Sequence, residues 1–163
     1  MTETAHSLEL TRVPVARVQM GIRRPVADVF EAFVDPAITS RFWFTKGSGR
    51  LHPGARVQWD WEMYGVSTMV TVREFEQDRR IRIDWSDEDP TTVEWDFTSL
   101  PDGMTLVTIT NSGFHGSGDE VAAQAIDSMG GFSMVLAGVK ALLEHDISLN
   151  LVADQFPSGG DAH

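Results

Sequence analysis

Hydrophobic and polar residues alternate through the middle of the chain. From Val57 to Met63, the odd-numbered positions carry Val, Trp, Trp and Met, while the even-numbered positions carry Gln, Asp and Glu. This period of two predicts a strand with one apolar and one acidic face. Similar runs bounded by turn residues predict further strands at 15–23, 66–75, 80–86, 91–99 and 104–112. The links between the later strands are too short for parallel crossovers, so we predict an antiparallel meander.

Two short helices are predicted between the first strand and the rest of the sheet. Pro25 precedes apolar residues that are spaced by three and four positions, and Asp35-Pro36 ends this pattern. A second short helix is predicted over 37–44, before a glycine-rich turn at 47–49.

One long helix is predicted after the last strand. Ser117 and Glu120 form the S-x-x-E capping-box pattern, and apolar residues then recur at helical spacing to about Asp146. Such a broad apolar face needs a large sheet to cover it. Gly130 and Gly131 lie inside this helix, where each glycine costs about 1 kcal/mol relative to alanine, so close packing or a bend is expected there.

The order of these elements defines the predicted fold class. We expect an α+β protein whose curved antiparallel sheet of six to seven strands wraps around the long C-terminal helix, with two short helices after the first strand. This order resembles the helix-grip fold of the Bet v 1/START-like proteins. One domain is predicted at 15–154, with an N-terminal extension at 1–14 and a flexible tail at 155–163.

The apolar positions of the strands are expected to share one concave face and to enclose a cavity against the long helix. Walls of aromatic residues and Met with few polar groups are typical of small-molecule pockets, although plain core packing is the alternative. The predicted cavity residues are Trp43, Trp59, Trp61, Met63, Ile83, Trp85, Trp95, Phe97, Ile109, Asn111, Met129, Phe132 and Leu136.

The polar side chains near this face have simpler interpretations. Asn111 is in phase with the cavity positions and could contact a ligand, or it could form a hydrogen bond at the end of its strand. The carboxylates of Asp60, Glu62, Glu94 and Asp96 alternate against the tryptophan positions. They are therefore expected on a solvated outer face with cross-strand charge pairs, not in an acid–base site.

Composition and motifs narrow the function classes. The 163 residues carry a formal net charge of −11, which opposes binding to nucleic acid or to an anionic membrane. The chain has no cysteine, its histidines lack metal-ligand spacing, and no cofactor or nucleophile motif occurs, so we predict no metal, no cofactor and no catalytic residue. A signal-peptide pattern and a membrane-length apolar stretch are not seen, so a cytoplasmic location is expected.

Several segments together resemble one known family. They lie at 25–33, 35–36, 41–43, 51–56, 73–75, 79–85, 108–114 and 130–132. Their order and spacing are similar to those of the activator-of-Hsp90-ATPase-homologue (AHSA1-like) family of the SRPBCC superfamily. The sequence departs from the family pattern at Phe132, where a Trp is usual, and at Asn111, where a His often stands.

The resemblance implies three functions. The first is binding of a small hydrophobic molecule in the cavity between sheet and helix. The second is a cyclase or hydrolase acting on a hydrophobic substrate there, and the third is an Hsp90-linked or other protein-interaction module. Small domains of this superfamily often associate, so a homodimer is compatible with the resemblance.

Overall fold

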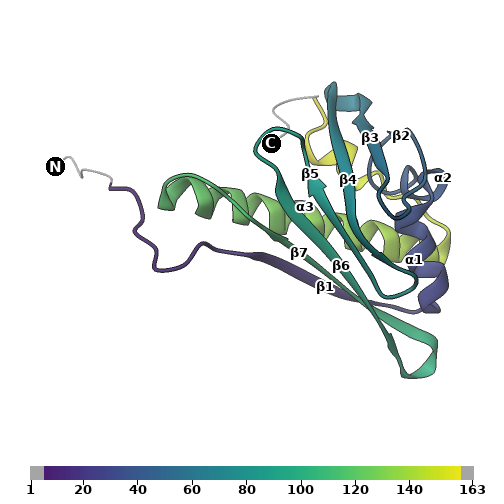
Figure 1. Cartoon of the computed structure of the whole chain (residues 1–163). Helices are drawn as coiled ribbons and strands as arrows, with labels where there is room; N and C mark the ends of the chain where they lie inside the picture. The colour runs from purple at the N-terminus through teal and green to yellow at the C-terminus, as the bar shows by residue number, and fades with distance from the viewer. Residues whose placement is uncertain (1–5, 159–163) are drawn as a thin grey trace.

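The computed structural model describes residues 6–158 and confirms the predicted α+β fold. A single seven-stranded sheet has the order β1-β7-β6-β5-β4-β3-β2, and each neighbouring pair is antiparallel (Figure 1). The strands are β1 (Ala16–Ile22), β2 (Lys46–Gly47), β3 (Arg56–Trp61), β4 (Val66–Glu76), β5 (Arg80–Trp85), β6 (Thr91–Leu100) and β7 (Met104–Ser112).

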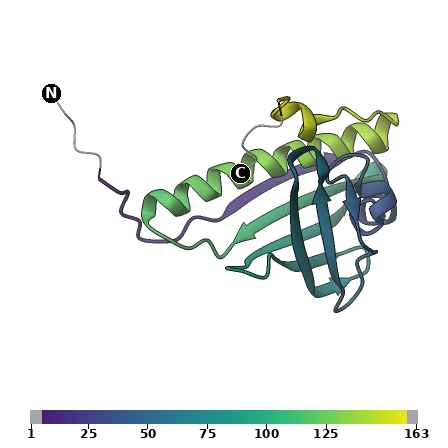
Figure 2. The same cartoon turned by 90° about the horizontal axis from the view of Figure 1, so that it is seen from above.

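Helices lie between the first strands and after the last one. They are α1 (Val26–Val34), α2 (Pro36–Thr39), α3 (Gly118–His145) and α4 (Leu151–Gln155), with 3-10 turns η1 (Glu62–Tyr64) and η2 (Pro101–Gly103). The long helix α3 packs against β1 and β7, and both views show its N-terminal half extending beyond β3 and β4 (Figures 1 and 2). The predicted second helix is shorter than 37–44, because the chain turns after Thr39 to bury Phe42, Trp43 and Phe44.

The start of α3 confirms the predicted capping box. Ser117 Oγ accepts a hydrogen bond of 3.2 Å from the backbone N–H of Glu120, and Glu120 Oε1 accepts one of 3.4 Å from the backbone N–H of Ser117. These bonds satisfy two donors that a helix start would otherwise leave without partners. The helix ends at Asp146, which adopts a left-handed conformation with φ of 52°.

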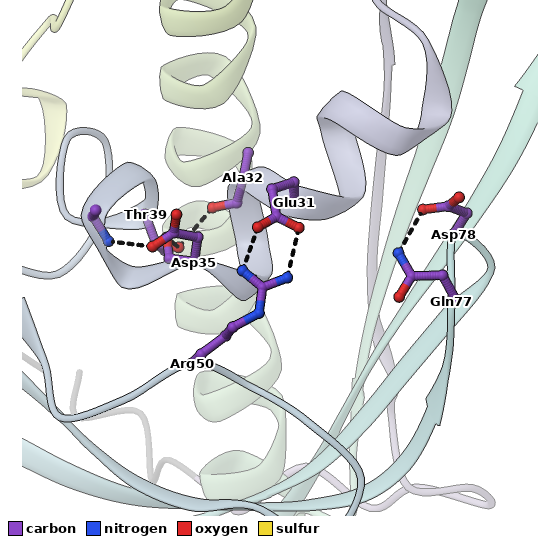
Figure 3. Close-up of polar contacts among 8 residues, drawn as sticks. Glu31, Ala32, Asp35, Thr39, Arg50, Gln77 and Asp78 are labelled. Carbon is purple, nitrogen blue, oxygen red and sulfur yellow. Dashed lines mark hydrogen bonds and ion pairs between the residues drawn. The ribbon is translucent and has the colours of Figure 1, made fainter.

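Local polar contacts hold α1, α2 and the following loop together (Figure 3). The hydroxyl of Thr39 donates to the carbonyl of Ala32 at 2.6 Å, and Asp35 Oδ1 accepts from the backbone N–H of Ala37 at 3.0 Å. Arg50 donates hydrogen bonds to both carboxylate oxygens of Glu31, with 2.8 Å between Nη2 and Oε2. The hydrogen bonds from Arg50 hold the pKa of the Glu31 carboxyl below its usual range.

The outer face of the sheet carries the predicted charge pairs. Arg80 Nε donates to Asp96 Oδ1 at 2.9 Å, and Arg73 Nε donates to Asp84 Oδ2 at 2.7 Å. Glu94 lies 3.5 Å from the same Arg80 nitrogen. These carboxylates therefore belong to a solvated ion-pair face and not to an enclosed acid–base site.

By length and composition alone, α3 could cross a membrane. In this fold, however, its buried residues pack on the sheet, and Leu136 and Val139 are among the most buried of the whole core. The helix is therefore a core element of the domain and not a signal sequence.

Candidate functional site

All five tryptophans of the chain gather in one cluster with Phe132 of α3. Trp43 is its centre: the centroid of its ring lies 5.0 Å from that of Trp59, 6.1 Å from that of Trp61, 5.9 Å from that of Trp85 and 6.1 Å from that of Trp95. Each additional aromatic pair of this kind contributes about 0.5–1.5 kcal/mol beyond the area it buries. The cluster therefore forms a closely packed aromatic wall.

The strand register explains how these residues meet. Trp59 and Trp61 are two positions apart on β3, so both project to the same face of the sheet. Trp85 and Trp95 project to that face from β5 and β6, where β5 pairs with both β4 and β6. Trp43 reaches the cluster from the segment after α2. This segment has no strand periodicity, so the sequence pattern did not fix the direction of Trp43.

A groove of about 560 Å³ lies between part of this wall and the N-terminal half of α3. Its lining combines an aromatic floor with a rim of hydroxyl and amide groups. The lining residues are Trp43, Trp61, Tyr64, Val66, Ser67, Thr68, Trp85, Ser86, Thr91, Asn111, Phe114, Gln124, Asp127, Ser128, Gly131, Phe132, Val135, Val152, Gln155 and Phe156.

The structure divides the predicted cavity residues into two main groups. Those that line the groove are Trp43, Trp61, Trp85, Asn111 and Phe132. Those that lie behind it as buried core are Trp59, Ile83, Trp95, Phe97, Ile109 and Leu136. About half of the predicted cavity residues are thus packed against other side chains and do not border the groove.

Met63 and Met129 are placed differently from the prediction. The alternating pattern suggested that Met63 continues the strand, but β3 ends at Trp61 and Met63 lies in η1, partly buried against the core. Gly65 ends that turn in a left-handed conformation with φ of 62°, which breaks the period of two. Met129 is 43% exposed, because the α3 wall of the groove is formed by a different series of positions at helical spacing, which includes Ser128 and Val135.

Asn111, which lines the groove, joins three elements. Its Nδ2 donates to Thr91 Oγ1 at 3.1 Å and to the carbonyl of Thr92 at 2.9 Å, while its Oδ1 accepts from Ser128 Oγ at 2.8 Å. The side chain therefore forms the predicted hydrogen bonds at a strand end and also lies at the groove. Because both ends of its amide have partners, its main role in this structure is to hold β6, β7 and α3 together.

Helix α4 closes one end of the groove and was not predicted. The hydroxyl of Tyr64 donates to the carbonyls of Val152 and Ala153, and the ring of Tyr64 lies 6.0 Å from that of Phe156. Gln155 and Phe156, at the start of the expected tail, thus contribute to the groove. The sequence signal for this contact was Tyr64 itself, since a buried Tyr hydroxyl normally has a hydrogen-bond partner and therefore requires another segment nearby.

The expected close packing at Gly130 and Gly131 is not found. Apart from the helix's own backbone and the adjacent residues, no atom lies within 4 Å of the Cβ position at either glycine, and α3 continues through both as one helix. Gly131 faces the groove, whereas Gly130 does not line it. The missing side chain at position 131 therefore leaves open space in the groove.

The lining offers little for acid–base chemistry. Asp127 is its one charged residue, and it lies exposed at the rim. Within residues 6–158, no group of three or more His, Asp or Glu side chains could hold a metal ion. The indole N–H of Trp95 is buried without a hydrogen-bond partner, but it belongs to the core behind the groove.

The sheet, the long helix and the aromatic groove together define a helix-grip domain of the SRPBCC type. The family model described as activator of Hsp90 ATPase homolog 1-like protein matches residues 23–144. The chain belongs to this family, and the resemblance seen in the sequence is confirmed.

Solved structures share this fold over most of the chain. A protein from Staphylococcus saprophyticus is 26% identical with a TM-score of 0.73, covering 83% of this chain and 96% of that one. The Aha1 dimer from Colwellia psychrerythraea is 16% identical with a TM-score of 0.69, covering 81% and 97%. An HSP90 activator from Plasmodium falciparum is 17% identical with a TM-score of 0.63, covering 80% and 96%. No curated protein matches the sequence.

Proposed function

We propose that this protein binds a small hydrophobic molecule in the groove between the tryptophan cluster and α3. The observation that carries the proposal is the groove: its volume of about 560 Å³ falls inside the range of roughly 300–1,000 Å³ that is typical of small-molecule sites. Its aromatic floor suits an apolar ligand body, and its hydroxyl and amide rim suits a few polar groups on that ligand.

The incomplete burial of the wall supports the same proposal. Trp85 is only partly buried, although it packs against Trp43, Trp61 and Phe132. A ligand that removes 100 Å² of this apolar surface from water would gain about 2.5 kcal/mol. The rings already hold each other in place, so the ligand would not have to order them.

A cyclase or hydrolase acting on a hydrophobic substrate is the alternative for the same groove. Such an enzyme needs a group that gives or takes a proton at the substrate. The lining supplies Asp127 alone, and the amide of Asn111 is engaged in hydrogen bonds. Binding without turnover is therefore the better-supported function, and loss of turnover of a bound substrate in Asp127→Asn would favour the enzyme instead.

A protein-interaction role rests on relatives and not on the groove. The Colwellia relative is a dimer, and the Plasmodium relative is an activator of HSP90. On adjacent turns of α3, Ile126 is 71% exposed and Met129 is 43% exposed, and together they offer an apolar patch to which a second copy of the chain could bind. In this role the protein would be a cytoplasmic homodimer. A pull-down with Hsp90, an Hsp90 ATPase assay and a sedimentation measurement test these roles.

The adjacent glycines of α3 allow a sharp test of the binding proposal. We expect compounds from a panel of lipids, polyketides and aromatic molecules to raise the melting temperature of the wild type. Gly131→Leu should narrow the groove beside the tryptophan cluster and reduce that shift, because its side chain enters the open space there.

Gly130→Leu is the matched control, since it makes the same change one residue away and outside the lining. Both variants replace a helical glycine, so both should fold at least as stably as the wild type. A panel without any melting shift would remove the proposal, as would equal shifts in the two variants.

A further inference from the structure

The charge of the groove lining is one-sided. Among the lining residues, Asp127 is the one that carries a charge, and within residues 6–158 no Lys, Arg or His belongs to the lining. The remaining polar groups are neutral hydroxyls and amides. A ligand with a carboxylate or sulfate group would therefore find no positive partner there, whereas a positively charged ligand would find a carboxylate.

The Asp127 carboxylate is available for such a partner. In the described chain it makes no hydrogen bond and no ion pair, and its side chain is exposed. The next residue, Ser128, donates a hydrogen bond of 2.8 Å to Asn111, so the helix at this point is anchored to β7 at the groove. The helix backbone that carries the carboxylate is thus held at the groove.

Open space lies beside α3 at Gly131, which lines the groove together with Asp127. Gly131 lies one helical turn after Asp127, about 6 Å along the axis, and a Cβ built there meets no atom within 4 Å. Phe132, the next residue, has its ring centroid 5.7 Å from that of Trp43 and 6.3 Å from that of Trp85. An occupant of the groove near Gly131 can therefore be close to Asp127 and to the tryptophan rings at once.

The surrounding surface strengthens this asymmetry. The turn between β5 and β6 carries Asp87, Glu88 and Asp89, and it connects the lining residues Ser86 and Thr91. Arg56 pairs with Asp87, which leaves Glu88 and Asp89 to add negative potential to this part of the rim. The chain as a whole has a net charge of −11, which attracts cations and repels anions.

We infer that the ligand of this groove is an organic cation: an amine or quaternary ammonium on an aromatic or aliphatic body, with its charge between Asp127 and the tryptophan rings. Ammonium groups are attracted to the face of Trp within about 6 Å of the ring centroid, and the attraction grows when the site is desolvated. The inference rests on the proposed binding function and names the chemical class that the groove selects.

The test uses three probes that share one apolar body: naphthylmethyl-trimethylammonium, neutral naphthylmethanol and naphthylmethyl-sulfonate, titrated by calorimetry into the full chain. We expect the ammonium to bind at least about tenfold more tightly than the sulfonate at low salt, and the ratio to shrink as salt screens the charges. Asp127→Asn should weaken ammonium binding about two- to fivefold, as expected for a partly exposed ion pair, and should leave the neutral alcohol unchanged.

Asp102→Asn is the control for the change in net charge. Asp102 lies in η2, at the opposite end of the β6–β7 ladder from Asn111, and Asn tolerates its left-handed φ of 63°. This variant should bind all three probes like the wild type.

The outcomes separate the two levels of the proposal. Binding of the alcohol with no preference for the ammonium, or equal effects of Asp127→Asn and Asp102→Asn, overturns the cation inference and leaves the proposed function intact. Absence of binding by all three probes overturns both.

Discussion

The aromatic interior has two ends that are covered to different degrees. The phenylalanine end contains Phe30, Phe33, Phe75 and Phe97, and the tryptophan end contains Trp43, Trp61, Trp85 and Phe132. At the phenylalanine end, α1 lies directly on the sheet, and Phe30 is fully buried. At the tryptophan end, the covering part of α3 has Gly131 and small polar residues, and a groove is left.

The difference shows that coverage, not aromatic content, separates core from binding surface here. Both ends have rings in contact at 5 to 6 Å, which is typical of aromatic packing. The phenylalanine end receives bulky side chains from a helix, so no space remains. At the tryptophan end, α3 contributes Phe132 to the cluster, but Gly131 and Ser128 beside it leave space, so one face of the wall stays accessible.

The largest expected effect is on stability, at the phenylalanine end. Phe30→Ala removes a fully buried ring that lies 5.3 Å from Phe75 and 5.1 Å from Phe97 between centroids. We expect a loss of about 3–5 kcal/mol in the free energy of unfolding, measured by urea denaturation. Phe30→Leu should cost clearly less, because it keeps most of the volume. A loss below about 1 kcal/mol for Phe30→Ala would mean that this end is not tightly packed.

The tryptophan end should respond in the opposite way. Trp85→Ala removes a partly exposed ring, so we expect a smaller stability loss of about 1–2 kcal/mol and a dissociation constant at least about tenfold higher for a groove ligand. Calorimetry and urea denaturation of the same preparation separate the two effects. If Trp85→Ala destabilised the protein as much as Phe30→Ala and left binding unchanged, the proposed difference between the two aromatic ends would be wrong.

The smallest expected effect concerns the ion pair beside α1. Arg50 lowers the pKa of Glu31 in the folded state, so the ionised carboxylate contributes stability at pH values above the usual glutamate range. This contribution is lost as the pH falls below about 4 through the lowered folded-state pKa. Because the pair is partly exposed, we expect Glu31→Gln to cost less than about 1 kcal/mol at pH 7.

The measurement is a pair of urea denaturation curves for wild type and Glu31→Gln at several pH values. The difference between them should shrink toward acidic pH. A difference that stayed constant down to low pH would show that Arg50 does not act through the charge of Glu31.

The sheet could be read from the sequence because its signal is local. Alternation in β3 placed Trp59 and Trp61 on the inner face, and the same period placed Asp96 on the outer face, where it pairs with Arg80. The capping box at Ser117 likewise marked the start of α3, since both of its hydrogen bonds join residues three positions apart.

The groove could not be read to the same depth because its shape depends on contacts between distant segments. The hydrogen bonds of Tyr64 to Val152 and Ala153 join segments that are about ninety residues apart in the chain, and no local sequence pattern predicts them. Met129 has the helical spacing of a core residue, yet the side of α3 that borders the groove is another one. Close packing or a bend was expected at the two glycines of α3, and instead one continuous helix passes through them and they border open space.

The sequence by itself determined the family, the order of the elements and the inward direction of the tryptophans, because periodicity and capping are set by neighbouring residues. Only the tertiary structure decided that Trp59 and Trp95 are core while Trp61 and Trp85 border a groove. The physical reason is that burial depends on which segment covers a side chain, and here the covering segments, α3 and α4, are distant in sequence from the strands.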